Sequence, residues 1–266
     1  MSAVVINGGL VHYEAFGRRG RPVLFLHGWL GSWRYWMPTM EAISDRHSTY
    51  ALDLWGFGDS DKSKPRYTIS DYTTLVNEFV TVRGIHDPTI IGHALGASVA
   101  LEYAVTHADN VRKVMAVSLP MNPDCINRKL IDFANNSVFA KMMWWRQITH
   151  KEVQKEAEKA GEGAISQSIQ SVAKVDVKSH IQSLSQRDNS MLLAVYGEKD
   201  DVIDPSPTRD LNGSWLNIRQ IGLSDSKHFP MLDEAAKFQR LLKDFLDVEN
   251  DLSALELKDE WRRRTR

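Results

Sequence analysis

A seven-residue stretch, GHALGAS at residues 92–98, has the spacing of a catalytic turn. It follows an apolar run that ends at Ile91, and the helix-like segment ASVALEYAV leads out of it. A strand, a tight Gly-x-x-x-Gly turn and a helix together form a nucleophile elbow, which holds a side-chain oxygen in the open at the start of a helix. The residue at the tip is Ala94, whose methyl group cannot attack a substrate. The sequence therefore predicts the turn without the nucleophile that such a turn serves.

The elements that would position this turn alternate between strands and helices. Apolar runs bounded by glycine predict strands, and apolar residues at helical spacing predict helices. Such alternation is typical of an α/β fold with a doubly wound, mostly parallel sheet, which we expect here. The expected strands are 3–6, 10–16, 22–27, 49–54, 89–93, 111–119, 191–197 and 215–223, and residues 7–9 form a glycine turn. Among the expected helices are 33–43, a helix capped by Ser70 or Asp71 that ends at Gly84, and 230–246.

This alternation stops between residues 120 and 188. The segment shows several helical patterns and no strand pattern, so we expect an all-helical cap inserted across one end of the sheet. The predicted organisation is a core formed by residues 1–119 and 189–247, a helical cap over 120–188, and a charged C-terminal tail over 248–266. We expect the tail to be a surface helix.

Composition limits the classes of partner. Of the 266 residues, 42% are hydrophobic and 25% charged, which is typical of a soluble globular protein. The net charge of -1 gives no reason to expect nucleic acid or a membrane as a partner, so a small-molecule ligand is expected. Because Cys125 is the single cysteine, no internal disulfide can form, and the N-terminus lacks the pattern of a signal peptide. A cytoplasmic location is expected.

Four stretches, in chain order, resemble α/β-hydrolases with a helical cap: LHGWLGS, DLWGFGDSD, GHALGAS, and the late pair GEKDDV and SKHFPML. The resemblance extends from the first strand to Leu246. It implies a hydrolase of a small ester-like or C–C-bond substrate, with no cofactor and no metal. The family usually has serine, sometimes cysteine or aspartate, where this chain has Ala94, so we expect it to be inactive as a serine hydrolase. Ser98, one helical turn further on, is expected to pack along the helix.

The resemblance also places the other two members of a catalytic triad, in the order nucleophile, acid and base. Asp200 follows the strand MLLAVYG, and His228 follows the last strand just before FPML. A carboxylate in this position fixes the imidazole tautomer and stabilises the protonated ring. Asp201 and Asp204 are alternatives for the acid, although each could instead cap a helix or form a turn.

The segment His27-Gly28 resembles the oxyanion loop of the family. The backbone N–H of the next residue, Trp29, would join the N–H of Leu95 in stabilising negative charge on a substrate oxygen. Backbone groups do not depend on the missing hydroxyl, so this oxyanion hole is expected to persist. For His27 and His93 the favoured interpretation is a hydrogen-bonded core histidine at the end of a buried strand.

Large side chains from this loop, the next helix and the cap are expected to line an apolar pocket, which implies a substrate with an apolar body. Aromatic residues at helical spacing also fill cores, and the two interpretations are balanced for Trp33, Trp36 and Trp145. The residues assigned to substrate binding are His27, Gly28, Trp36, Met142, Met143 and Trp144.

Three hypotheses account for Ala94. In the first, the parent protein is a serine hydrolase acting on an ester, thioester, lactone or C–C bond, and the alanine is a deliberate replacement. In the second, the alanine is natural and the protein binds a ligand without converting it. In the third, it is natural and His228 with Asp200 acts as a general base, for lyase or cofactor-free oxygenase chemistry. All three place the ligand at the same site.

Overall fold

The computed structural model describes residues 2–63, 65–134, 150–161, 163–211 and 215–257. Within these ranges eight strands form one sheet, in the spatial order β1-β2-β4-β3-β5-β6-β7-β8. β2 pairs antiparallel with both β1 and β4, and all other pairs are parallel, which confirms the predicted α/β class. The strands are β1 Ser2–Ile6, β2 Gly9–Phe16, β3 Pro22–Leu26, β4 Ser48–Leu52, β5 Thr89–His93, β6 Lys113–Val117, β7 Met191–Gly197 and β8 Ile218–Leu223.

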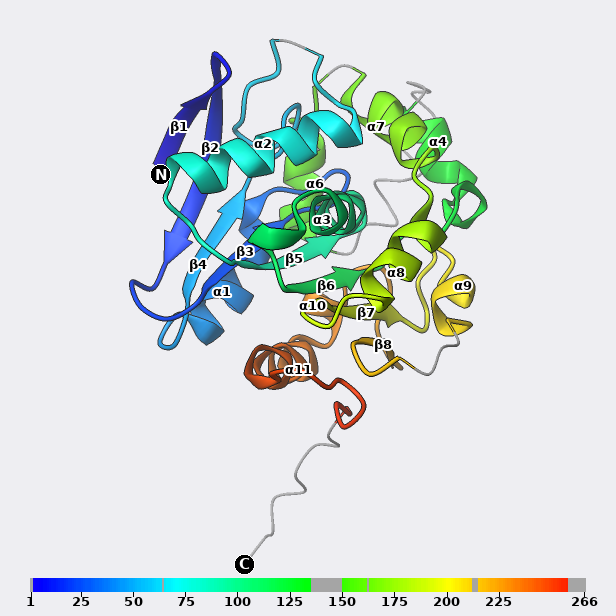
Figure 1. Ribbon diagram of the computed structural model, residues 1–266. Coiled ribbons are helices and arrows are strands. Elements are labelled where there is room, and N and C mark those ends of the chain that lie inside the picture. Colours follow the sequence, from blue (N-terminus) through cyan, green and yellow to red (C-terminus); the bar gives the residue numbers. More distant parts are fainter. Residues whose placement is uncertain (1, 64, 135–149, 162, 212–214, 258–266) are drawn as a thin grey trace, which may run out of the picture.

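Helices cover both faces of this sheet (Figure 1). On one face α3 packs on β5 and β6 and is flanked by α2 and α8, and on the other face α1 packs against α11. Because both faces are covered, every residue of β5, β6 and β7 is buried, as the continuous apolar runs predict. These helices are α1 Met37–Ile43, α2 Ile69–Val82, α3 Leu95–Thr106, α8 Val177–Ser185 and α11 Ala235–Asp247.

Local sequence signals mark the turn of the β1–β2 hairpin and the start of α2. Asn7 and Gly8 both have positive φ (49° and 74°) between β1 and β2, so the predicted glycine turn is confirmed. The N-cap of α2 is Thr68, not Ser70 or Asp71. Its side chain accepts from the Asp71 N–H, and the Asp71 carboxylate accepts from the Thr68 N–H, which forms a capping box. The expected cap residues therefore lie inside the first turn.

The C-terminal region differs from expectation in two ways. The expected single helix is divided at Glu234 (φ −124°, ψ 52°) into α10 Pro230–Asp233 and α11. Residues 248–257 are not helical, and Leu252 and Leu255 are buried. The Leu252 N–H donates to the Leu216 carbonyl at 2.7 Å, so this part of the tail is anchored beside β8. The prediction of a surface helix is wrong for 248–257, and residues 258–266 lie outside the described ranges.

Between β6 and β7 the described residues form helices and short turns. α6 contacts the 3-10 helix η1, α7 contacts α2 and α3, and α8 packs against α3. The last helix of the segment therefore belongs to the layer over the sheet, while the division into core, cap and tail stays a prediction. The remaining elements are η1 Trp33–Trp36, η2 Ala108–Asn110, η3 Pro123–Cys125, α4 Arg128–Ala134, α6 Lys151–Ala157, α7 Ala164–Val172 and α9 Ser206–Arg209.

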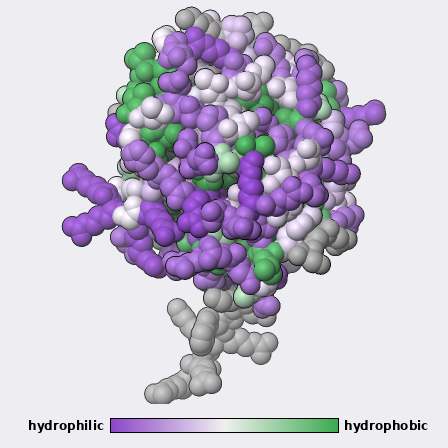
Figure 2. All heavy atoms as spheres, in the orientation of Figure 1, coloured by the Kyte–Doolittle hydropathy of each residue, from purple (hydrophilic) through white to green (hydrophobic). Residues whose placement is uncertain are grey.

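The face of the molecule in Figure 2 is largely hydrophilic, with apolar side chains scattered over it. Among the described helices, none combines the length and the apolar character needed to cross a membrane.

Candidate active site

Ala94 occupies a sharp turn between β5 and α3. Its backbone has φ 47° and ψ −106°, a combination that residues with a Cβ rarely adopt. The two flanking glycines are required by close approach of the backbone. A Cβ on Gly92 would lie 2.1 Å from the Gly96 carbonyl oxygen, and one on Gly96 would lie 2.4 Å from the Leu26 carbonyl oxygen. The geometry expected of an elbow is present at this turn.

The Asp200 carboxylate and the His228 imidazole are brought together by the loops after β7 and β8. His228 Nδ1 lies 3.0 Å from Asp200 Oδ2 and 3.2 Å from Oδ1, and the two side chains are 8% and 1% exposed. A carboxylate only accepts hydrogen bonds, so Nδ1 carries the proton. His228 Nε2 forms no hydrogen bond with the described part of the chain. This nitrogen is therefore available to accept a proton from a ligand.

Asp200 is held as a carboxylate. Burial raises its pKa, but His228 and the backbone N–H groups of Val202 and Ile203, each 2.9 Å from Oδ1, outweigh burial, and the pKa lies below its ordinary value. The alternative acids are placed differently, and Asp201 is exposed. Asp204 accepts from the N–H and hydroxyl of Ser206, as expected for a turn residue.

Two backbone N–H groups lie at the elbow. Trp29 lies in the loop after β3, and Leu95 is the first residue of α3. Within the described ranges, neither N–H donates a hydrogen bond to the protein. A Cβ on Gly28 would lie 3.1 Å from the Ala94 Cβ, so this loop passes directly beside the elbow. The arrangement suits two donors that act on one ligand oxygen.

The Trp29 side chain is fixed by a helix that the sequence did not link to it. Its indole Nε1 donates to the Ser168 hydroxyl on α7 at 2.9 Å, and Trp29 is only 4% exposed. The two residues are separated by 139 positions, and nothing in the sequence pattern connects them. α7 therefore helps to shape the wall of the site beside the Trp29 N–H.

Known proteins resemble this chain in sequence over its N-terminal half and in fold over most of its length. A family model described as alpha/beta hydrolase fold matches residues 21–148. The enol-lactonase from Burkholderia xenovorans LB400 has a similar structure, with a TM-score of 0.79 at 18% identity, covering 92% of this chain and 99% of that chain. The chain has the α/β-hydrolase fold.

Individual proteins that resemble this chain differ in the activity for which they are named. The soluble epoxide hydrolase of Corynebacterium sp. (strain C12) is 34% identical over 115 residues, 43% of this chain and 40% of that protein. The dihydrolipoyllysine-residue acetyltransferase component of the acetoin cleaving system of Cupriavidus necator is 30% identical over 122 residues, 46% of this chain and 33% of that protein. The matches thus span less than half the length of these curated relatives. A meta-cleavage product hydrolase from Pseudomonas fluorescens IP01, in a serine-to-alanine variant, has a TM-score of 0.72 at 18% identity, covering 92% and 97% of the two chains.

His27 is a structural residue in this α/β-hydrolase fold, contrary to its assignment to substrate binding. The ring is fully buried, its Nδ1 lies 2.8 Å from the Gly28 carbonyl oxygen, and its Nε2 accepts from the Leu54 N–H at 2.9 Å. Burial lowers the pKa of His27 despite the opposing effect of Asp53, so the ring is neutral. Both nitrogens are used by the protein, and neither is left for a substrate. The interpretation of His27 as a hydrogen-bonded core histidine is confirmed.

Trp36 also departs from the place expected of a substrate-binding residue. It is fully buried, and its ring packs at 5.1 Å from the ring of Phe25 on β3 and 6.3 Å from that of Phe238 on α11. It fills the core on the face covered by α1 and α11. Met142, Met143, Trp144 and Trp145 lie outside the described residues.

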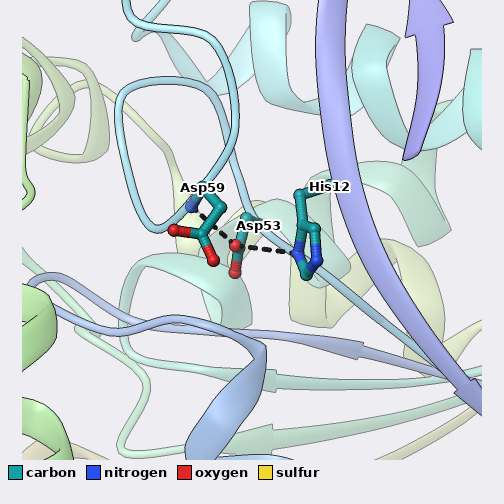
Figure 3. Close-up of side chains that lie close together, drawn as sticks. All are labelled: His12, Asp53 and Asp59. Atoms are coloured by element: carbon teal, nitrogen blue, oxygen red, sulfur yellow. Dashed lines mark hydrogen bonds and ion pairs between the residues drawn. The ribbon is translucent and has the colours of Figure 1, made fainter. Parts of the chain in front are cut away.

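A second polar cluster holds the loop after β4 (Figure 3). Asp53 is fully buried. Its Oδ1 accepts from the Trp33 N–H at 2.8 Å, and its Oδ2 accepts from the Asp59 N–H at 2.9 Å. His12 Nδ1 lies 3.2 Å from the same Oδ2. A Cβ on Gly58, which has φ +52°, would lie 2.3 Å from the Asp53 Cγ. Asp53 therefore fixes this loop beside η1.

The same three side chains could hold a metal ion by distance, since one ligand atom from each of His12, Asp53 and Asp59 lies within 4.8 Å of the others. The carboxylates of Asp53 and Asp59, however, already have partners within the protein. Arg34 Nη2 lies 2.8 Å from one Asp59 oxygen and Lys159 Nζ 3.2 Å from the other. Burial raises the pKa of Asp59, but these two cations outweigh it and the pKa is lowered. We interpret the cluster as a structural ion-pair network.

That network also joins α6 to the core. Glu156 on α6 is 4% exposed and lies 3.2 Å from Arg34 Nη1 and 2.9 Å from Lys159 Nζ. With Asp59 the four side chains form a closed ring of alternating charge. The Gly161 N–H adds a backbone hydrogen bond to the Gly56 carbonyl at 2.7 Å. Sequence spacing could indicate only the Glu156–Lys159 pair, which is three residues apart, because Arg34 and Asp59 are far from both along the chain.

Proposed function

We propose that the site at Ala94 binds a small ester-like substrate, or one with a scissile C–C bond, and that the protein with serine at this position is a hydrolase. The observation that carries the proposal is the conformation of Ala94. A backbone with φ 47° and ψ −106° is strained for any residue with a Cβ, typically by about 1–3 kcal/mol. Such strain is expected where a hydroxyl must be presented to a substrate, and a methyl group gains nothing from it.

The other parts of the site support the same proposal. His228 Nε2 is open, and its ring is oriented by Asp200 at 3.0 Å, as a general base for a hydroxyl requires. The N–H groups of Trp29 and Leu95 are free of protein partners in the described ranges and would bind the oxygen of a tetrahedral intermediate. The meta-cleavage product hydrolase with a similar fold also has alanine in place of one serine. With Ala94 the chain would hold a substrate without forming an acyl-enzyme.

The proposed substrate is small and has an apolar body. Trp29, 4% exposed and held by Ser168, contributes a large apolar side chain to the loop that passes beside the elbow. The net charge of -1 favours no polyanionic partner, and we propose neither nucleic acid nor membrane as a partner, and no cofactor. The likeness to an enol-lactonase is consistent with an ester-like bond. A cytoplasmic location is part of the same proposal.

One observation favours a second candidate, in which no nucleophile is needed. The His228–Asp200 pair is complete and Nε2 is free of protein hydrogen bonds in the described chain, so the imidazole could remove a proton from a bound substrate or water. This would be lyase or cofactor-free oxygenase chemistry on the Ala94 protein itself. A pure ligand-binding role would need neither the pair nor the strained turn.

The substitution Ala94→Ser tests the first candidate. The variant should become labelled by a fluorophosphonate and hydrolyse short p-nitrophenyl esters, whereas the double variant Ala94→Ser/His228→Ala should be labelled at least about 100-fold more slowly. The parent chain is the control and should resist labelling. A folded Ala94→Ser protein that is silent in both assays would contradict the hydrolase proposal.

A screen of the unaltered chain tests the second candidate. Turnover of a ligand that disappears in His228→Ala would support general-base chemistry. Ligand affinity that is the same in both proteins, without turnover, would instead support a binding role.

A further inference from the structure

Three loops that form the site meet at one buried ring, that of His93, the residue before Ala94. The Gly28 N–H donates to the Tyr35 hydroxyl at 2.6 Å, the Tyr35 hydroxyl lies 3.1 Å from His93 Nδ1, and His93 Nε2 lies 2.8 Å from the His228 carbonyl oxygen. His93 is fully buried and Tyr35 is 3% exposed. The loop that carries the Trp29 N–H and the loop that carries His228 are therefore connected through a single imidazole.

The direction of each hydrogen bond follows from the chemistry of its two ends. A carbonyl oxygen only accepts, so the proton of His93 is on Nε2. Burial and the neighbouring His228 place the pKa of His93 well below its ordinary value, so the ring is neutral and Nδ1 has a lone pair. The Tyr35 hydroxyl must then donate to Nδ1, and its oxygen accepts from the Gly28 N–H. The chain of bonds runs from Gly28 to His228 without an unsatisfied group.

We infer that His93, held as its neutral Nε2–H tautomer between the His228 carbonyl and the Tyr35 hydroxyl, is a positioning residue for both halves of the site. It fixes the backbone of His228 from one side of the ring, and Gly28 rests against the other, where an added Cβ would lie 2.7 Å from Nδ1. The inference rests on the proposed role of His228 as the base. The Ser118 hydroxyl is a weaker second donor to the same carbonyl, at 3.4 Å.

Packing alone would not require this imidazole. The His93 ring centroid lies 4.6 Å from that of His228 and 5.0 Å from that of Phe229, contacts that a phenyl ring could also make. A phenyl ring would, however, leave the proton of the buried Tyr35 hydroxyl without its acceptor and the His228 carbonyl with only the weaker Ser118 donor. The difference between the two rings is the hydrogen-bonding path, and a matched set of substitutions can isolate it.

The test uses nitrogen-15 NMR of histidine-labelled protein, which needs no activity. In the parent chain His93 should show the Nε2–H tautomer, and His228 a downfield Nδ1 proton bonded to Asp200. His93→Gln keeps a donor near the Nε2 position and should keep that His228 proton. His93→Phe should speed its exchange with solvent by about tenfold or more while the protein stays folded. An Nδ1–H tautomer at His93, or an unchanged His228 signal in folded His93→Phe, would overturn the inference.

Tyr35→Phe provides an independent test if His93→Phe does not fold. Without the hydroxyl, Nδ1 loses its donor, and its nitrogen-15 shift should move downfield towards that of an unbonded imidazole nitrogen, while Nε2 keeps its proton on the His228 carbonyl. Unchanged shifts would contradict the assigned role of Tyr35. In the Ala94→Ser background, fluorophosphonate labelling should fall by about tenfold or more with His93→Phe but by less than about threefold with His93→Gln. If Ala94→Ser is never labelled, the hydrolase proposal fails while the NMR result still decides the role of His93.

Discussion

Asp200 and His228 face each other at 3.0 Å although they lie on separate loops, after two neighbouring parallel strands. The pair is oriented on both sides: two backbone N–H groups hold the carboxylate, and His93 holds the backbone of His228. The acid and the base of the site at Ala94 therefore both have a defined position.

Relief of strain at the elbow should stabilise the protein. Glycine adopts positive φ without the penalty that Ala94 bears, which is about 1–3 kcal/mol, whereas its extra freedom in the unfolded chain costs about 0.4–1 kcal/mol. Ala94→Gly should therefore raise the free energy of unfolding by about 1 kcal/mol, measured by urea denaturation. The matched control is Ala97→Gly, inside α3, which should lower it by about 1 kcal/mol. A destabilised Ala94→Gly would mean that the turn is not strained.

Gly96 should be intolerant of a methyl group because backbone, not a movable side chain, occupies the space. A Cβ there would lie 2.4 Å from the Leu26 carbonyl oxygen, so Gly96→Ala should separate α3 from β3 and cost about 3 kcal/mol of unfolding free energy. Gly84→Ala is the control, since its Cβ would meet nothing within 4 Å and only its φ of +61° is unfavourable. It should cost about 1 kcal/mol. Equal losses would show that close approach at Gly96 is unimportant.

Stability should fall as the solution becomes acidic, and His93 should contribute to the slope. The unfolded chain takes up a proton at this residue near its ordinary pKa of 6.5, whereas burial delays uptake in the folded chain to much lower pH. The unfolded state therefore binds more protons below about pH 6.5, and the free energy of unfolding decreases as pH falls through that range, by at most about 1.4 kcal/mol per pH unit. His27, also lowered by burial, acts in the same direction.

Denaturation of the parent and of His93→Gln at about pH 7 and about pH 5 measures this contribution. The variant should lose less stability on acidification than the parent does. An identical loss would show that His93 takes up its proton equally in both states.

The charge ring between α6 and the core should contribute to stability. Glu156→Gln leaves Arg34 and Lys159 opposite Asp59 alone and should cost about 1–2 kcal/mol, discounted because the two cations are 32% and 38% exposed. The effect should shrink at high salt. Glu158→Gln, at the exposed C-cap residue of the same helix, should change the unfolding free energy by less than about 0.5 kcal/mol. Similar losses from both substitutions would argue against the ring.

The parts of the fold that the sequence predicted are those with local causes. β7 coincides with the predicted strand at 191–197 because a continuous apolar run ended by glycine admits little else, and the elbow is recognisable from its two glycines. The Asp200–His228 pair could be placed only through a resemblance, because 28 residues that include the strand β8 separate its members.

What could not be predicted depends on tertiary contacts. Helical periodicity indicates that Trp36 is buried but not which layer buries it, and the ring lies against Phe25 and Phe238. The assignment of His27 to a substrate failed because its hydrogen bond to Leu54 spans 27 residues. The role of Tyr35 had no sequence signal, since it depends on a hydrogen bond between residues 58 positions apart.

The bond between Trp29 and Ser168 has a consequence for the way in which the protein is made. A chain that emerges from the ribosome in order presents this indole 139 residues before its hydroxyl partner exists. Until α7 arrives, the polar nitrogen has only water to bind, and the wall beside the elbow has no fixed shape. The site is therefore one of the last regions of the molecule to acquire its final form, although its central turn is complete by residue 98.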